Sequence, residues 1–169
     1  MAIREVPIDS PIEVKLAWAQ NCYRELREEL LGDERIVEIL RSFKESMQDS
    51  HKAMVTAGVV DECKDCEQRE GGSCCGAGLE NRYNGILLLI NLLLNVKIPE
   101  KRYDPLSCFF LGQRGCQLLA RHVICVNYLC KKVTDRIDPQ KIALLREKEG
   151  VELECLFFLH ERIKKKLIS

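Results

Sequence analysis

The sequence predicts an all-α fold of about five helices that carries two irregular cysteine-rich loops. Its 169 residues suit a single domain spanning 1–169. Apolar residues recur at helical spacing over most of the chain, and this periodicity lapses in two segments, 61–78 and 106–130. Within the second segment, two short apolar runs around glycines predict a small β-hairpin near 108–118.

Two helices with a very short link between them are predicted in the N-terminal part. Ser10 and Glu13 form a capping-box pattern at the start of the first helix. Gly32 ends this helix, and Asp33 is placed to cap the second, which stops near Gly58. Because the link is so short, we expect the two helices to form an antiparallel hairpin.

A third helix is predicted from about Leu79 to Val96. It is apolar over most of its circumference, so we expect it to run through the centre of the fold. Asn84, Asn91 and Asn95 fall on one side of it, where a solvated or hydrogen-bonded stripe is the favoured interpretation.

Two further helices complete the predicted fold. One covers His122 to Val133, and the other opens at Asp138 and Pro139 and continues toward the C-terminus. Gly150 weakens this last helix and is a point at which it could divide in two.

Charge and hydropathy exclude several classes of partner. The chain has 26 basic and 26 acidic residues, so it lacks the basic excess that nucleic acids and anionic membranes require. The most apolar stretch, Ile86 to Leu94, is too short to cross a bilayer. The first eleven residues lack the apolar run of a secretory signal, which favours a cytoplasmic location. A protein partner stays open.

Ten cysteines are the most unusual feature of the composition. In a reducing compartment, clustered thiols indicate metal or redox chemistry rather than disulfides. Cys63 and Cys66 have the C-x-x-C spacing that lets two thiolates reach one metal. Cys74 and Cys75 follow among glycines. Because adjacent side chains point in different directions, this pair suits a multinuclear centre, or one ligand and one neighbouring thiol.

A second group of cysteines begins at the predicted hairpin. Cys108 and Cys116 bracket this hairpin and can converge across it. Cys125 and Cys130 would diverge by about 140° on one unbroken helix, so either the helix breaks or only one of them, preferably Cys125, faces the site. The predicted metal ligands are therefore Cys63, Cys66, Cys74, Cys75, Cys108, Cys116, Cys125 and Cys130.

The order of these motifs resembles the YkgJ-like cysteine-cluster family of zinc- or iron-chelating proteins. The matching elements are C-x-x-C, the CC pair, CFFLGQRGC and RHVIC, which together span Cys63 to Cys130. The chain has Phe109 and His122 where the family pattern has proline. The resemblance implies a metal-chelating role, and related cysteine clusters occur in flagellin lysine N-methylases.

Thiolate ligands favour zinc, iron–sulfur clusters or copper(I), and disfavour magnesium and calcium. Zinc is the preferred cofactor, with an iron–sulfur cluster as the alternative. The leading hypothesis is a metal-binding protein in which the metal orders the two loops. An iron–sulfur enzyme or electron carrier and a metal storage or delivery protein are the alternatives. No familiar catalytic motif is present, so enzymatic activity stays open. Among the histidines, His122 is the one considered as a further ligand.

Overall fold

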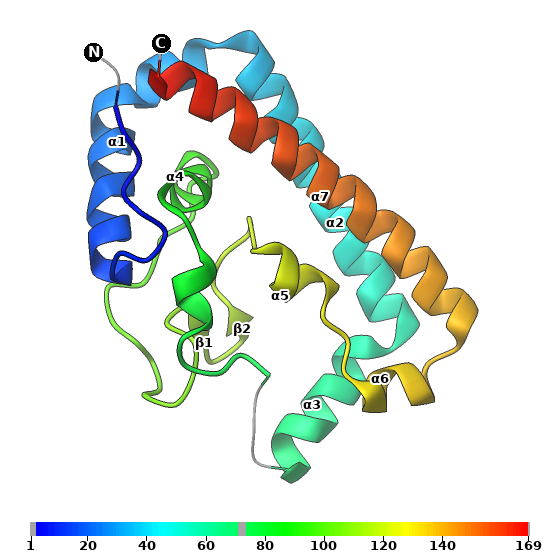
Figure 1. The fold of residues 1–169 in the computed structure, drawn as a ribbon. Helices are drawn as coiled ribbons and strands as arrows, with labels where there is room; N and C mark the ends of the chain where they lie inside the picture. The colour runs from blue at the N-terminus through cyan, green and yellow to red at the C-terminus, as the bar shows by residue number, and fades with distance from the viewer. Residues whose placement is uncertain (1–2, 71–73, 169) are drawn as a thin grey trace.

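The fold is mainly helical with one small antiparallel hairpin, which confirms the predicted fold class (Figure 1). The structure is a computed structural model that describes residues 3–70 and 74–168. The elements are the helices α1 (Ile12–Gly32), α2 (Glu34–Ala57), α3 (Val59–Glu70), α4 (Gly85–Leu93), α5 (Val123–Asn127), α6 (Lys131–Arg136) and α7 (Pro139–Ile168), the 3-10 helix η1 (Leu79–Arg82), and the strands β1 (Leu111–Gly112) and β2 (Gly115–Cys116).

Helices α2 and α7 form a long antiparallel pair along one side of the molecule (Figure 1). Apolar residues at helical spacing on each helix are buried between them and against the core, among them Phe43, Leu145 and Leu159. The predicted start of α7 is confirmed, because Asp138 Oδ1 accepts a hydrogen bond from the Gln140 N–H at 2.8 Å. Helix α7 continues through Gly150 without a break.

The predicted hairpin of the first two helices is wrong. Helix α1 packs chiefly against α4, whereas α2 packs against α7, and α1 and α2 diverge from their junction (Figure 1). Their link is the single residue Asp33, with φ −80° and ψ 109°, and a helical hairpin needs a loop of about 2–5 residues to reverse the chain. The contact with α4 is close, since a Cβ at Gly85 would collide with the ring of Trp18.

Of the two predicted helix N-caps, one is confirmed and the other is wrong. Asp33 caps α2 as predicted, accepting hydrogen bonds from the Arg35 and Ile36 N–H groups at 3.1 Å. The capping box of Ser10 and Glu13 is wrong, because α1 has no side-chain cap. Pro11 takes the N-cap position with ψ 150°, which leaves Ser10 outside the helix, in a turn that starts at Pro7.

The irregular loop predicted for 61–78 is wrong over its first half, which is the helix α3. This helix is polar and contacts α2 and α6 rather than the centre of the fold, so apolar periodicity could not reveal it. Asp61 and Glu62 lie in its first turn, where negative charge stabilises a helix. The helix predicted from His122 to Val133 is also interrupted, giving the short helices α5 and α6.

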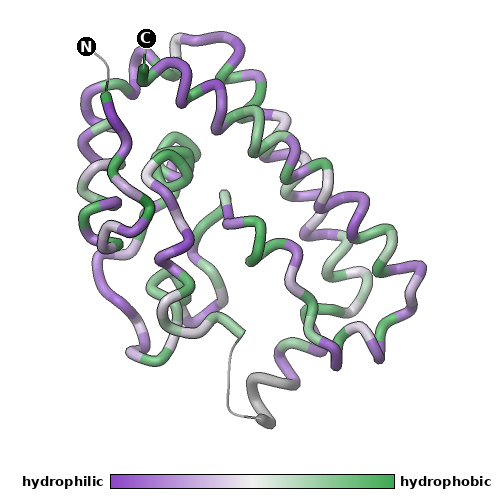
Figure 2. The backbone as a smooth tube through the Cα atoms, viewed as in Figure 1, coloured by the Kyte–Doolittle hydropathy of each residue, from purple (hydrophilic) through white to green (hydrophobic). Residues whose placement is uncertain are grey.

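Helix α4 lies at the centre, as predicted, although it is shorter and is preceded by η1. Figure 2 shows its hydrophobic residues enclosed by more polar segments, and Leu88, Leu89 and Ile90 are fully buried. Two members of the asparagine stripe are hydrogen-bonded, since Asn84 caps α4 by accepting from the Leu87 N–H and Asn91 is buried among backbone partners, whereas Asn95 is exposed. Within residues 3–70 and 74–168, no helix is long and apolar enough to cross a membrane.

Candidate metal centre

Four of the predicted ligands come together from three separate segments. Cys75 follows α3, Cys108 and Cys116 lie on the two sides of the hairpin, and Cys125 lies on α5. They are close enough that charge on one thiol raises the pKa of its neighbours: Cys75 acts in this way on the other three, and Cys116 acts on Cys108. The hairpin therefore brings Cys108 and Cys116 into one neighbourhood, as its position in the sequence predicts.

Backbone hydrogen bonds join the loop of Cys75 to the chain before the hairpin. The Cys108 N–H donates to the Cys75 carbonyl at 2.7 Å, and the Ala77 N–H donates to the Leu106 carbonyl at 3.0 Å. Between these two bonds, Gly76 and Ser107 form an isolated antiparallel bridge. The two cysteines are thus held in register, although 33 positions separate them in the sequence.

A buried ion pair reinforces this junction. Glu80 is 3% exposed; one of its carboxylate oxygens pairs with Arg102, and the other accepts from the Gly78 N–H at 3.0 Å and the Phe109 N–H at 3.4 Å. Burial by itself would raise the pKa of Glu80, but the hydrogen bonds from Arg102 and the backbone outweigh it and lower that pKa. Arg102 also donates to the Ser107 carbonyl.

The buried side chain of Tyr83 links the chain that follows η1 to the segment that carries His122 and Cys125. It is 1% exposed, and its hydroxyl donates to Cys125 Sγ at 3.7 Å while accepting from the His122 N–H at 3.2 Å. A proline at position 122 could not donate this hydrogen bond. Burial, and then the charges of Cys116 and Cys125, raise the pKa of Tyr83 far above its ordinary value. The phenol therefore stays protonated and is a donor to sulfur.

Asn91 and Phe110 complete the frame around the thiols. Asn91 Oδ1 accepts from the Leu119 and Ala120 N–H groups at 2.9 and 3.0 Å, and its Nδ2 donates to the Ala120 carbonyl at 2.9 Å. Phe110 is fully buried in the hairpin segment and packs edge-on against Tyr83, with ring centroids 5.0 Å apart. The segment between Cys116 and Cys125 is thereby fixed to α4.

The electrostatic setting of the thiols favours the neutral form unless a cation is bound. Burial raises the pKa of Cys108 to about 11, and it also raises the pKa values of Cys116 and Cys125. Cys116 is nevertheless an exposed residue, so burial affects its thiol less clearly than that of the buried Cys108. Arg121 acts in the opposite direction and lowers the pKa values of Cys116 and Cys125.

The donor set fits a soft metal, but its geometry is not that of a formed site. In the described part of the chain, no three Cys, His, Asp or Glu side chains make a group compact enough to hold an ion. Four thiols with a nearby guanidinium and a buried phenol donor are nevertheless the chemistry that stabilises a negatively charged metal–thiolate centre. Metal binding would require the sulfur atoms to move closer together.

The other four predicted ligands lie elsewhere or beside this group. Cys63 is exposed on α3, which projects away from the hairpin (Figure 1). Cys66 is on the same helix, and its side chain lies outside the described residues. Cys74 is exposed next to Cys75. Cys130 precedes α6 and packs in a separate apolar cluster with Val59.

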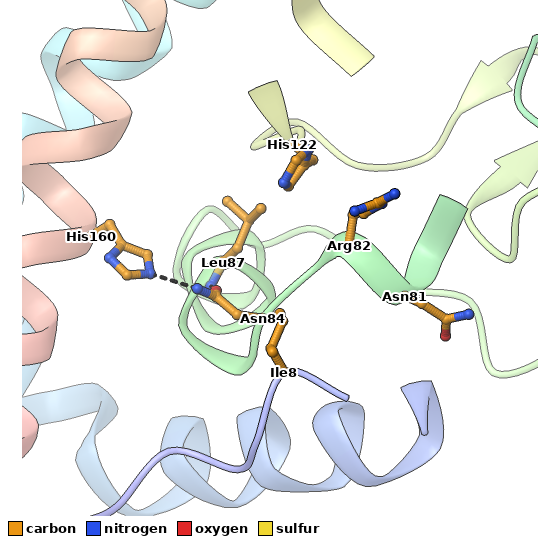
Figure 3. Close-up of a pocket in the computed structure, with 7 residues that line it drawn as sticks. All are labelled: Ile8, Asn81, Arg82, Asn84, Leu87, His122 and His160. Atoms are coloured by element: carbon orange, nitrogen blue, oxygen red, sulfur yellow. Dashed lines mark hydrogen bonds between the residues drawn. The ribbon is translucent and has the colours of Figure 1, made fainter. Parts of the chain in front are cut away.

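The remaining cysteines and His122 have structural positions. Cys22 is buried, and Cys155 packs at the edge of the core. His122 caps α5, since its Nδ1 accepts from the Ile124 N–H at 3.2 Å. Its ring lines a neighbouring cleft (Figure 3).

Sequence reasoning missed Tyr83, Glu80 and Arg102. None of these residues belongs to a cysteine motif, and the contacts from Glu80 to Arg102 and from Tyr83 to Cys125 span 22 and 42 positions of the chain. Asn91 was visible only as a member of the asparagine stripe, and the sequence did not show which backbone groups it binds. These contacts between distant segments are what converts three cysteine-bearing segments into one neighbourhood.

Comparisons with protein-family models, curated proteins and solved structures find no match to this chain. The resemblance to the cysteine-cluster family therefore stays a prediction from the motifs.

Proposed function

We propose that this protein binds a thiolate-preferring metal through Cys75, Cys108, Cys116 and Cys125. The single observation that supports the proposal most is the set of hydrogen bonds that holds the three cysteine-bearing segments together, from the Cys108 N–H to the Cys75 carbonyl and from Tyr83 to Cys125 Sγ. Four sulfur donors suit tetrahedral zinc, with Zn–S bonds of about 2.3 Å. Zinc is our first choice of cofactor.

The proposed role of the metal is to stabilise the junction of the loops. Four protein ligands fill a tetrahedral zinc site and leave no position for a substrate, which is typical of structural rather than catalytic zinc. Tyr83 and Arg121 would support the negatively charged thiolates, the first as a hydrogen-bond donor and the second as a nearby cation. Reduced thiols are expected in the cytoplasm, so the proposal includes that location.

An iron–sulfur centre at the same residues is the second candidate. It is favoured by Cys74, an exposed cysteine directly beside Cys75 that a mononuclear zinc site does not need. In that case the protein would be an electron carrier or an enzyme rather than a metal-stabilised scaffold. Reversible storage or delivery of metal would instead require weak, exchangeable binding.

Metal analysis of protein purified without oxygen tests the proposal. We expect about one zinc per chain and a colourless protein. Cys108→Ser and Cys125→Ser should each reduce zinc affinity by at least about tenfold, whereas Cys130→Ser, in the separate cluster, should leave it unchanged. Circular dichroism of each variant shows whether loss of metal follows from loss of fold.

The outcomes separate the candidates. Iron with sulfide and broad visible absorption, lost in the same two variants, would select the iron–sulfur centre. A competition titration in which a weak chelator removes the metal at once would select storage or delivery. A wild-type protein that takes up neither metal, or a Cys125→Ser variant that is folded and retains wild-type affinity, contradicts the proposal.

A further inference from the structure

A cleft of about 400 Å³ lies between the chain around η1 and helices α4 and α7 (Figure 3). Pockets that take small ligands have volumes of roughly 300–1,000 Å³. Ile8 and Leu87 provide its apolar surface, and no acidic residue lines it within the described part of the chain. Its polar lining consists of Asn81, Arg82, Asn84, His122 and His160.

Hydrogen bonds to the main chain determine which nitrogen of His122 carries a proton. The Ile124 N–H donates to Nδ1 of His122 at 3.2 Å, so Nδ1 of the neutral ring acts as an acceptor. The proton of this ring is then on Nε2. The ring therefore offers an N–H donor that the helix cap does not use, and its residue lines the cleft.

The same reasoning applies to Asn84 and His160. Asn84 Oδ1 accepts from the Leu87 N–H at 2.8 Å, which leaves its amide nitrogen to face Nε2 of His160 at 2.9 Å. His160 Nε2 is then the acceptor (dashed line in Figure 3). Asn84 has a second N–H that this contact does not use.

Arg82 gives the cleft a positive charge. Among the residues that the structure describes, no carboxylate forms an ion pair with Arg82, and its charge acts on His122. The nearest helix end, at α4, already has acceptors for two of its N–H groups, Glu5 for Ile86 and Asn84 for Leu87. Arg82, the Nε2–H of His122 and one N–H of Asn84 remain available in the cleft as hydrogen-bond donors.

We infer that this cleft binds a small molecule through its carboxylate or phosphate group, with Arg82 and His122 as the principal donors. A guanidinium binds the oxygens of such a group in two places, and a neutral imidazole N–H adds a directional hydrogen bond. Ile8 and Leu87 would cover the apolar part of the ligand. The inference does not depend on the metal proposal, since none of these donors is a proposed metal ligand.

The cleft and the thiols nevertheless share two segments of the chain. Arg82 and Asn84 flank Tyr83, and His122 donates its backbone N–H to the hydroxyl of Tyr83. A ligand in the cleft would therefore contact residues next to the group that donates to Cys125. Tyr83 therefore connects the anion site to the proposed metal centre, although no cysteine lines the cleft in the described part of the chain.

Calorimetric titration of the protein as purified, with inorganic phosphate and separately with succinate, tests the inference. We expect binding of at least one anion with Kd on the order of millimolar, as suits such small ligands. The anion that binds more tightly shows whether phosphate or carboxylate is preferred. Arg82→Gln should weaken binding about tenfold, by removing hydrogen bonds to a charged group.

Arg114→Gln is the matched control, because Arg114 is exposed at the hairpin turn and does not line the cleft. It should leave the affinity unchanged, and His122→Gln should lower it. Imidazole resonances of His122 should shift on titration, and those of the exposed His51 should not. The inference is overturned if neither anion binds, or if Arg82→Gln and Arg114→Gln weaken binding equally.

Discussion

Glu80 in the loop region and Glu152 between α2 and α7 are both buried, yet their environments are opposite. Glu80 has Arg102 and two backbone N–H donors, and its pKa is lowered. Glu152 is completely buried, its hydrogen-bonded partner is Ser50, and burial raises its pKa. Within the described residues, its second oxygen has no hydrogen-bond partner.

The hydroxyl of Ser50 shows which form of Glu152 is preferred. Ser50 Oγ lies within hydrogen-bond distance of the Met47 carbonyl, at 3.1 Å, and of Glu152 as well. Because a hydroxyl has one proton, it cannot donate to both at once. A protonated Glu152 can donate to Ser50, which then donates to Met47. The neutral acid satisfies this pair better than the carboxylate does.

The difference teaches that hydrogen-bond donors, rather than depth of burial, decide whether a buried glutamate is charged. The segments around Glu80 have little regular secondary structure, and satisfied polar groups hold them together alongside buried side chains such as Phe109 and Phe110. The pair of α2 and α7 has extensive apolar faces and tolerates a polar group that is only partly satisfied. Three substitutions test this comparison.

The largest effect is expected for Asn91→Leu. The substitution leaves the backbone N–H groups of Leu119 and Ala120 without their acceptor, and each such buried group costs roughly 1–3 kcal/mol. We expect the free energy of unfolding in urea to fall by about 3 kcal/mol. Asn127→Leu, at an exposed position on α5, is the control and should change it by less than about 0.5 kcal/mol. If both substitutions lowered the free energy of unfolding equally, the hydrogen bonds of Asn91 would not be what stabilises the segment around Leu119 and Ala120.

Glu80→Gln should have the next largest effect, a loss of about 2 kcal/mol at neutral pH. Breaking a fully buried pair costs more, but Arg102 is 28% exposed, so solvent screens part of the interaction. The pKa of Glu80 is lowered from 4.5, so its stabilising contribution is present above pH 4.5 and is lost as the pH falls below it.

Urea unfolding of wild type and Glu80→Gln at several pH values checks both points. The difference in unfolding free energy should shrink on acidification. Glu62→Gln, which removes the more exposed pair with Arg136, should cost less than about 1 kcal/mol. A Glu80→Gln protein as stable as wild type at neutral pH would show that the ion pair does not stabilise the junction.

Glu152→Gln should have the smallest effect, and of the opposite sign. The pKa of Glu152 is raised above 4.5, so the stability gained from the protonated form is present below pH 4.5 and is lost as the pH rises through the folded-state pKa. At about pH 8 we expect the variant to be more stable than wild type, by on the order of 1 kcal/mol. The gain should disappear at about pH 4, and a variant less stable at pH 8 would contradict the assignment.

The sequence predicted those elements that are marked by neighbouring residues, such as helix caps and apolar runs. Asp33 and Gly58 mark helix ends by their own chemistry, and the apolar run of α4 predicts its central position. Helix α3 was missed because its sequence is polar and has no apolar periodicity. The pairing of α2 with α7 was not visible because Ser50 and Glu152 are 102 positions apart.

Only part of the candidate site was predicted, because only some of its features have signals in neighbouring residues of the sequence. The spacing of Cys108 and Cys116 implies a hairpin, and hairpin geometry brings them together. Cys130 follows a helix break at 128–130 and packs with Val59 and Val133, and neither feature is visible in the spacing of the cysteines. The links from Glu80 to Arg102 and from Tyr83 to Cys125 join distant segments, so a pattern along the chain does not show them.

The close fit of Gly85 against Trp18 also gives the molecule an intrinsic optical probe. Trp18 is the sole tryptophan of the sequence, half-buried where α1 meets α4, with its indole N–H donating to the Arg4 carbonyl at 3.0 Å. Its fluorescence emission therefore reports the docking of these two helices, while helical circular dichroism is dominated by the longer α2 and α7. Recording both signals during one denaturation shows whether the two parts of the protein unfold together or in sequence.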